Sequence, residues 1–166
     1  MKHLSHLFLI FLLGTGFFSC DKTWVFEKYQ RIADAEWHKD SLIRFRVPVT
    51  DTLQSHNLLI GVRNTTHYKY SNLWLFLEME SPAGEMQKDT FNILLAQPSG
   101  EWLSEGIGKI KTRQAIFRRN LTFPHSGDYS ISLQHGMREE VLKGIHDIGV
   151  RLEKVKNKSI EAEQRE

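Results

Sequence analysis

The sequence predicts an all-β domain, an antiparallel β-sandwich of roughly seven to nine strands. Apolar and polar residues alternate with a period of two in several short segments, as half-buried strands require. Motifs rich in proline and glycine separate these segments and are typical of tight turns. No long segment has the periodicity of an amphipathic helix, so a sandwich, or else a closed barrel, is needed to bury the alternating faces.

Three strands are predicted in the first half of the domain. Their ranges are 42–49, 58–62 and 72–80. Pro48 cannot donate a ladder hydrogen bond, so the end of the first strand is expected at a sheet edge or a bulge. In the third strand, leucines and a methionine occupy one face, while Trp74 and Phe76 stand on the other face with two glutamates. We therefore expect this strand to be covered on both sides near its start.

Four further strands are predicted in the second half, after a Ser-Pro-Ala-Gly turn at 81–84. Their ranges are 90–96, 111–123, 128–135 and 147–153. The alternation is clearest in the third of these, where Leu133 is expected to face the core and Ser132 to lie on the opposite, solvated face. Before the last strand, residues 137–144 are expected to form one helical turn.

The first twenty residues have the pattern of a secretory signal peptide. A polar stretch with Lys2 precedes an unbroken apolar run from Leu7 to Leu13, and the apolar part is shorter than the ~20 residues that a membrane-spanning helix needs. Ser19 then precedes Cys20, the only cysteine in the sequence, in an arrangement that resembles a bacterial lipobox. The thiol of such a cysteine is alkylated with diacylglycerol and the peptide is cut before it. The cysteine then becomes an acylated N-terminus, carrying chains such as palmitate. Stable anchoring takes at least two chains, which this modification provides.

The predicted chain has four parts. They are a lipoprotein signal peptide at 1–19, a lipidated N-terminus and tether at 20–36, the β-sandwich domain at 37–154 and a charged C-terminal tail at 155–166. The tether lacks clear periodicity. Its aromatic residues Trp24, Phe26 and Tyr29 are expected to dock on the domain, and the alternative is that they lie at the lipid interface. With Cys20 used for the anchor, no cysteine remains for an intramolecular disulfide.

Composition and charge bound the classes of function. Lys2 is the only charged residue among the first twenty, so the formal net charge falls from +2 to +1 when they are removed. A mixed and nearly neutral surface gives no support for nucleic-acid binding, which normally leaves a basic stripe. The remaining chain is long enough for one domain with a packed core.

No motif in the sequence carries catalytic or metal chemistry. The histidines after the signal peptide are dispersed and are expected in loops or at solvated positions: His38, His56, His67, His125, His135 and His146. Glu78 and Glu80 share a strand face, but two successive outward acids are ordinary there. The glycines around Lys109 lack the full phosphate-loop pattern, and no nucleophile elbow is present. We therefore expect no enzyme activity, no cofactor, no metal and no small-molecule substrate.

Two kinds of surface site are predicted. Trp102 and Leu103 lie in a loop with nearby glycines, where an exposed tryptophan would anchor a protein partner; the alternative is that Trp102 closes one end of the core. Ser41, Thr52 and Thr90 each stand in an Asp-Ser/Thr-apolar tripeptide. These tripeptides resemble the O-glycosylation motif of exported Bacteroidetes proteins, and Thr52 is the best placed because it lies between predicted strands.

A long run of the mature chain resembles a known family. The run extends from Asp89 to Lys154, and the segments YSNLWLFLE and WHKDSLIRF fit the same pattern. They are similar to the gliding-motility lipoprotein GldH family of Bacteroidetes. The resemblance covers Cys20 to Lys154, maps Cys20 onto the lipidated cysteine of the family and offers no catalytic residue.

The resemblance implies an outer-membrane lipoprotein that is a non-enzymatic accessory or assembly component of gliding and of the linked type IX secretion apparatus. Its partners would be proteins of that machinery, and the lipid on Cys20 would hold it to the membrane. The segment after Cys20 lacks the acidic cluster of a surface-export signal, and this lack favours a periplasm-facing protein. The alternative is a carbohydrate-binding lipoprotein of a nutrient-uptake system. That function needs coplanar exposed aromatic residues beside amide or acid groups, and Trp74, Phe76 and Trp102 are its candidates.

Overall fold

The computed structural model describes residues 24–106 and 108–155. The predicted signal peptide and Cys20 lie outside the described residues, as do residues 156–166 of the predicted tail. Within the described ranges, no helix combines the length and the apolar character that crossing a membrane requires.

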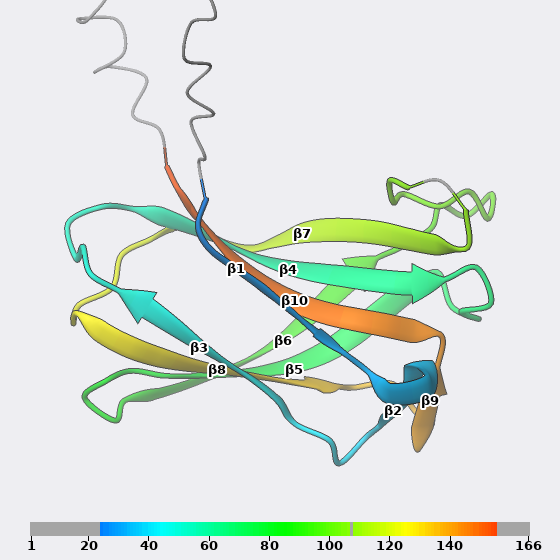
Figure 1. Ribbon diagram of the computed structural model, residues 1–166, viewed down its shortest axis with the longest axis horizontal. Coiled ribbons are helices and arrows are strands. Elements are labelled where there is room, and N and C mark those ends of the chain that lie inside the picture. Colours follow the sequence, from blue (N-terminus) through cyan, green and yellow to red (C-terminus); the bar gives the residue numbers. More distant parts are fainter. Residues whose placement is uncertain (1–23, 107, 156–166) are drawn as a thin grey trace, which may run out of the picture.

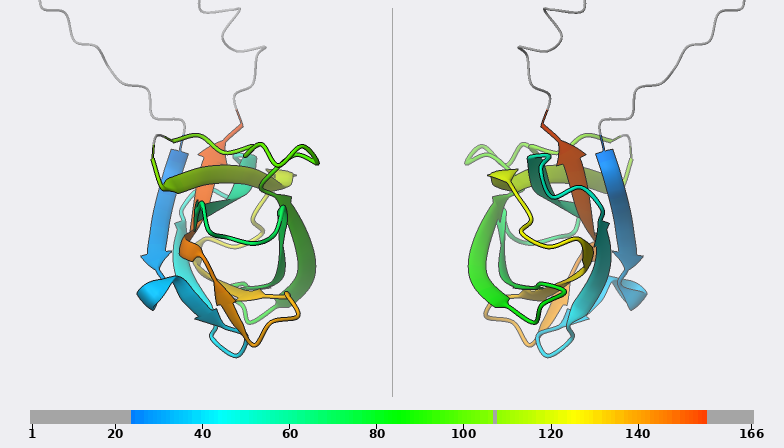
Figure 2. Two further views of the ribbon diagram at one scale, coloured as in Figure 1. Left: turned by 90° about the vertical axis from the view of Figure 1, so that its right-hand side faces the viewer. Right: turned by 90° about the vertical axis from the view of Figure 1, so that its left-hand side faces the viewer.

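Two four-stranded antiparallel sheets face each other and enclose the core (Figure 1, Figure 2). The first sheet has the strand order β1 (Trp24–Arg31), β10 (Ile145–Lys154), β4 (His56–Thr65), β7 (Ile110–Leu121). The second has the order β3 (Ile43–Val49), β8 (Gly127–His135), β5 (Asn72–Glu80), β6 (Met86–Leu94). A two-stranded ribbon joins β2 (Glu36–His38) to β9 (Val141–Lys143). The predicted antiparallel sandwich is confirmed, with ten strands in the described part of the chain.

Alternation along the strands directs one face of each sheet into the core. In β3 and β5 the inward residues are apolar and almost fully buried, as predicted: Ile43, Phe45, Val47, Val49, Leu73, Leu75, Leu77 and Met79. The first sheet supplies the opposing layer through Leu58, Ile60, Val62, Ile148, Val150 and Leu152. Removal of this apolar surface from water, at ~25 cal/mol per Å², is the main contribution to the stability of the fold.

Side chains close the sandwich where β6 and β7, edge strands of different sheets, approach each other. The rings of Phe91 and Phe117 meet edge to face with their centroids 5.3 Å apart. Arg118 of β7 also donates to Asp89 of β6, with an N···O distance of 3.1 Å. This hydrogen bond lowers the pKa of Asp89 below its usual range, so the carboxylate stays charged at neutral pH.

The segment predicted as a tether belongs largely to the sandwich. Residues 24–31 form β1, which pairs antiparallel with β10, and a short 3₁₀ helix (Ala33–Ala35) and β2 follow it. The described sandwich therefore includes Trp24–Arg31, which precede the predicted start of the domain at residue 37. The period of two is weak in this segment because β1 is an edge strand and Phe26 is its only side chain packed against the core.

Three further expectations concern single strands. Residues 137–144 contain β9 and not a helical turn, because Val141–Lys143 pairs with β2. Ser132 is only 8% exposed and does not lie on a solvated face, since the register places it between Arg44 and Glu78 on the neighbouring strands. The expectation from Pro48 is confirmed, because β3 is an edge strand.

A tyrosine fills a slot between two glycines on the outer face of the first sheet. Gly61 of β4 pairs with Gly149 of β10, which in turn pairs with Tyr29 of β1. A Cβ atom added to Gly149 would lie 2.6 Å from Cδ1 of Tyr29, and one added to Gly61 would overlap its hydroxyl end. The ring therefore lies flat across both glycines, with the guanidinium of Arg63 4.0 Å from the ring centroid. For Tyr29, docking on the domain rather than a place at the lipid interface is therefore what the structure shows.

Gly61→Ala is expected to lower the free energy of unfolding by ~1–3 kcal/mol, because the added methyl group overlaps Tyr29. In a Tyr29→Ala background the overlap is gone, and Gly61→Ala should then be neutral or slightly stabilising, since alanine loses less backbone entropy than glycine in a strand. Urea denaturation of the four proteins in this double-mutant cycle measures the coupling. Equal effects of Gly61→Ala in both backgrounds would contradict the packing described.

Candidate functional site

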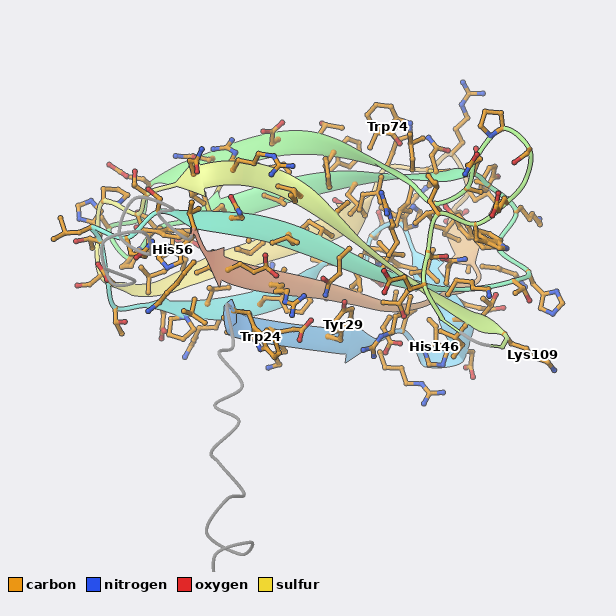
Figure 3. The ribbon with its side chains drawn as sticks, turned by 90° about the horizontal axis from the view of Figure 1, so that it is seen from above. Trp24, Tyr29, His56, Trp74, Lys109 and His146 are labelled. Atoms are coloured by element: carbon orange, nitrogen blue, oxygen red, sulfur yellow. The ribbon has the colours of Figure 1, made fainter. Side chains whose placement is uncertain are left out.

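The outer face of the first sheet is occupied by contacts within the chain (Figure 3). The guanidinium of Arg151 lies 4.5 Å from the ring centroid of Trp24 and donates to Gln114 at 2.6 Å. The same side chain forms ion pairs with Glu27 and Glu153, at 3.7 Å and 3.3 Å. Because these aromatic and charged groups contact one another, this face offers little apolar area to a partner.

The outer face of the second sheet is different, because large apolar side chains project from it. Trp74 and Phe76 on β5 are 42% and 48% exposed, and Leu94 on β6 is 56% exposed. The register pairs Trp74 with Asn92, so Leu94 is its diagonal neighbour at about 7–8 Å. The expectation that β5 is covered on both sides near its start is therefore wrong. We call Trp74, Phe76, Leu94 and the pocket beside them the Trp74 surface.

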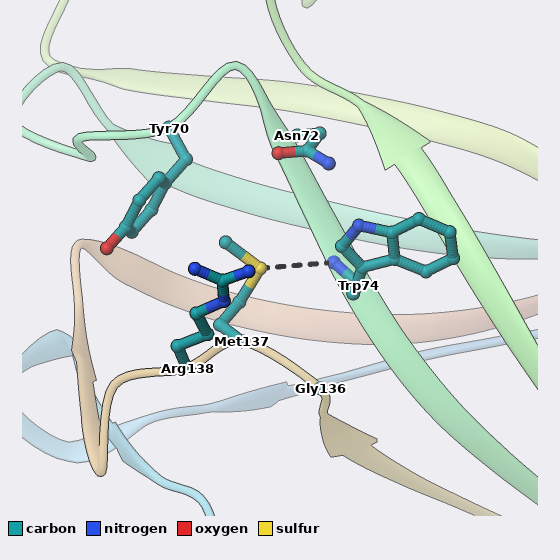
Figure 4. Close-up of a pocket in the computed structure, with 6 residues that line it drawn as sticks. All are labelled: Tyr70, Asn72, Trp74, Gly136, Met137 and Arg138. Atoms are coloured by element: carbon teal, nitrogen blue, oxygen red, sulfur yellow. Dashed lines mark hydrogen bonds between the residues drawn. The ribbon is translucent and has the colours of Figure 1, made fainter.

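A pocket of about 480 Å³ adjoins the indole of Trp74 (Figure 4). It is lined by Tyr70, Asn72, Trp74, Gly136, Met137 and Arg138. The backbone N–H of Trp74 donates to the sulfur of Met137 at 3.4 Å, which ties the segment after β8 to the start of β5. The pocket is thus built from one strand and from two loop segments that are distant in the sequence.

Gly136 allows Phe76 to lie against the end of β8. Its N–H donates to the carbonyl oxygen of Trp74 at 2.7 Å and extends the pairing between the two strands. A Cβ atom at this position would lie 3.2 Å from Cε2 and Cζ of Phe76 and 3.5 Å from Cβ of Trp74. The absence of a side chain therefore leaves room for the phenyl ring beside the pocket.

Polar groups surround the apolar part of the Trp74 surface. Asn72 donates to the side-chain oxygen of Asn92 at 2.9 Å. Tyr70 donates to Glu139 at 3.0 Å, and this hydrogen bond raises the pKa of the phenol, so the hydroxyl stays protonated. The lining residues include no carboxylate, histidine, serine or cysteine. The phenol, amide and guanidinium of the lining are groups that bind ligands through hydrogen bonds.

The predicted partner contacts Trp102 and Leu103 are both half-buried. Trp102 forms an isolated bridge with Ala96 and packs against the core, which is the alternative given for it from the sequence. The N–H of Leu103 donates to the carbonyl oxygen of Leu95 at 2.8 Å, and its side chain borders a second pocket, of about 350 Å³. A partner-binding role for these two residues stays a prediction.

The three predicted O-glycosylation sites differ in their exposure. Ser41 is exposed and precedes β3, and Thr90 is exposed within β6. Thr52, the residue best placed by sequence, is half-buried in a bend where the carboxylate of Asp51 accepts the backbone N–H groups of Leu53 and Gln54, at 3.0 Å and 3.1 Å. Glycosylation at any of the three stays a prediction.

The expectation that the histidines are loop or solvated residues is wrong for two of them. His56 is 3% exposed and His135 is 2% exposed. His135 meets Trp37 edge to face, with 5.5 Å between the ring centroids. Burial lowers the pKa of both imidazoles below the usual 6.5. In the described ranges, no group of three His, Cys, Asp or Glu side chains is arranged to hold a metal ion.

His135→Phe is expected to flatten the pH dependence of stability below pH 6.5. Because the pKa of buried His135 is lowered, the unfolded chain binds more protons than the folded one as the pH falls through 6.5 and toward the folded-state pKa. The free energy of unfolding of the unmodified protein should therefore decrease on acidification, and phenylalanine removes this contribution. Denaturant titrations across pH ~5–8 measure it, and parallel curves for the two proteins would contradict the prediction.

Sequence reasoning did not identify Tyr70, Gly136, Met137 or Arg138 as site residues. They lie in two loops that only the pairing of β5 with β8 brings together. The sequence did contain one signal, since Trp74 and Phe76 occupy outward positions of a strand whose inward positions are filled by other apolar residues.

The fold and this surface define the class of protein, an antiparallel β-sandwich with an exposed aromatic patch on one sheet. The family described as GldH lipoprotein matches residues 24–152. The chain belongs to this family, and the resemblance inferred from the sequence is confirmed. The matched range begins and ends within the two strands β1 and β10, so it spans the whole sandwich.

Two curated relatives cover most of the chain. It is 37% identical over 164 residues to a gliding motility lipoprotein GldH homolog of Christiangramia forsetii, covering 95% of this chain and 100% of the relative. It is 33% identical over 152 residues to the gliding motility lipoprotein GldH of Flavobacterium johnsoniae, covering 87% and 94%. Among solved structures, a family GH115 4-O-methyl-α-glucuronidase aligns with a TM-score of 0.40 and 11% identity, covering 82% of this chain and 18% of the enzyme. This last similarity is too distant to bear on function.

Proposed function

We propose that this chain is an outer-membrane lipoprotein, acylated on Cys20 and facing the periplasm, that serves as a non-enzymatic accessory or assembly component of the gliding and type IX secretion machinery. The family membership and the names of both relatives support a lipoprotein connected with gliding motility. The signal-peptide pattern and the single cysteine after Ser19 support the anchor.

The Trp74 surface is the place where this component binds a partner protein. The observation that supports this proposal is the exposure of Trp74, Phe76 and Leu94 side by side on one sheet face, while the opposite sheet's outer face is filled by internal contacts. Tryptophan, other aromatic residues and methionine are enriched in the centres of protein interfaces, and charged groups lie at the rim. Met137 lines the pocket beside Trp74 as a further apolar contact, and Arg138 supplies a charged group at the rim.

Trp74→Ser combined with Phe76→Ser is expected to abolish or strongly weaken crosslinking of the native partner, because it removes the apolar anchors. The measurement is in-cell crosslinking of the tagged full-length lipoprotein, followed by mass spectrometry. Met86→Ser is a matched control, since Met86 lies on the same strand pair, is 54% exposed and is at the far end of β6 from Leu94. Both variants should unfold at the same temperature as the unmodified protein within a few degrees. An unchanged set of crosslinked partners in the double variant would overturn the proposal.

Carbohydrate binding is the second candidate, and the pocket of about 480 Å³ favours it. An indole, a tyrosine, an amide and a guanidinium converge there, and aromatic faces with fixed polar groups are typical of small-ligand sites. The amide of Asn72 is already paired with Asn92, which leaves fewer of its hydrogen-bonding groups for a sugar. Affinity electrophoresis on a panel of polysaccharides separates the two functions. Retardation that is lost in Trp74→Ala, with no protein partner recovered by crosslinking, would establish the second function in place of the first.

A further inference from the structure

We propose that the end of the sandwich where β1 begins rests on the lipid headgroups and that Leu53 inserts into the bilayer interface. This inference rests on the proposed acylation of Cys20. We call this end, which holds Trp24, Lys154 and residues 51–55, the Trp24 end. Figure 3 shows Trp24 toward the same end as His56, while Lys109 lies at the opposite end.

The length of chain between the anchor and the domain limits their separation. Only residues 21–23 lie between Cys20 and Trp24, the first residue of β1. A fully extended chain covers at most ~3.6 Å per residue, so Trp24 lies within about 14 Å of the acylated residue. The headgroup region on each side of a bilayer is roughly 5–8 Å thick, so this limit leaves the domain next to the membrane surface.

The pairing of the strands places residues 51–55 at the same end. Trp24 pairs with Glu153, and the next residue of β10, Lys154, pairs with His56 at the start of β4. Neighbouring strands are ~4.8 Å apart, so the start of β4 is about 10 Å from that of β1. Val155 also donates its N–H to Ser55 at 2.9 Å, which holds the bend against the end of β10.

Leu53 is the most exposed large apolar side chain of the described residues, at 93%. The carboxylate of Asp51 accepts the N–H groups of Leu53 and Gln54, and Gln54 donates to the carbonyl oxygen of Val155 at 3.1 Å. The backbone N–H groups lower the pKa of Asp51, so the carboxylate that holds the bend remains charged at neutral pH. A bend held by these hydrogen bonds thus presents one leucine outward. Transfer of an exposed apolar side chain near an acyl anchor from water into the bilayer interface is favourable.

Charge does not decide this contact, because both signs occur at the Trp24 end. Lys154 is exposed there, while Asp51 and Glu153 carry negative charge nearby. The proposed contact is therefore apolar, made by Leu53 beside the acyl chains.

The Trp74 surface lies near the start of β5. Figure 3 places Trp74 away from Trp24 and His56, so the Trp74 surface is clear of the proposed membrane contact and open to a periplasmic partner.

The test uses the full-length acylated protein reconstituted in phosphatidylethanolamine–phosphatidylglycerol vesicles that contain a nitroxide-labelled phospholipid. The thiol of Cys20 is consumed by the lipid, so a single new cysteine carries an environment-sensitive fluorophore. Leu53→Cys is compared with Leu94→Cys, which replaces another leucine that is 56% exposed, and with Ser99→Cys, which is exposed in the turn after β6. Quenching by the lipid nitroxide should be several-fold greater at position 53 than at positions 94 and 99, with a blue-shifted emission at position 53 only.

Two results would overturn the inference while leaving the lipoprotein proposal in place. One is equal quenching at all three positions in protein whose mass shows acylated Cys20. The other is a glycan on Thr52 of the vesicle-bound protein, because a sugar in this bend would hold Leu53 in water. Mass spectrometry that finds no acyl group on Cys20 would overturn the lipoprotein proposal and this inference together.

Discussion

Replacement of Cys20 by alanine is expected to abolish acylation and to leave an uncleaved or soluble product. In the proposed modification the sulfur atom of Cys20 accepts the diacylglycerol, and Cys20 is the only cysteine in the chain. Each acyl CH₂ buried in lipid contributes ~0.8 kcal/mol, so loss of the chains would remove the proposed membrane attachment. Metabolic labelling with a fatty-acid analogue, followed by membrane fractionation, measures both effects.

A second variant shows that the position of the cysteine matters and not merely its presence. Cys20→Ala combined with Ser99→Cys keeps one thiol in the chain, at an exposed turn that is distant in the sequence from the predicted signal peptide. It should incorporate no label. Equal incorporation in the unmodified protein and in Cys20→Ala would show that the lipobox interpretation is incorrect.

The sandwich could be predicted because its central strands follow a simple physical rule. In β3 and β5, every second residue is apolar and is buried, so the period of two in the sequence corresponds directly to the two faces of a sheet. Pro48 marked an edge strand for an equally local reason, the missing N–H. The family resemblance rested on longer runs of residues and was confirmed over residues 24–152.

β1 and the pocket could not be predicted because they depend on contacts between distant segments. Tyr29 packs against Gly61 and Gly149, and a glycine in a sequence does not reveal which ring covers it. Met137 reaches the start of β5 only through the register of β8, which no local pattern fixes. The burial of His135 was missed for the same reason, because an imidazole is apolar enough to pack edge to face on Trp37 when the fold brings them together.

Leu133→Ala is expected to lower the free energy of unfolding by ~2–5 kcal/mol, a large share of the ~5–15 kcal/mol that stabilises a typical domain. Leu133 is fully buried, and the register places it between Ile43 of β3 and Leu77 of β5, which are buried as well. Truncation leaves a cavity that these neighbours on two separate strands fill only partly, so both the lost transfer free energy and the cavity contribute.

The matched control for this prediction is Ser130→Ala, on the outward side of the same strand. Ser130 is half-buried and pairs with Arg46 and Glu80, so removal of its hydroxyl opens no cavity in the core. Its effect should be within ~0.5 kcal/mol. Urea denaturation of the three proteins at one pH gives the comparison, with equal m-values as evidence that the unfolded states are alike. Similar losses in both variants would mean that β8 does not direct Leu133 into the space between the sheets, and the register of the second sheet would have to be reassigned.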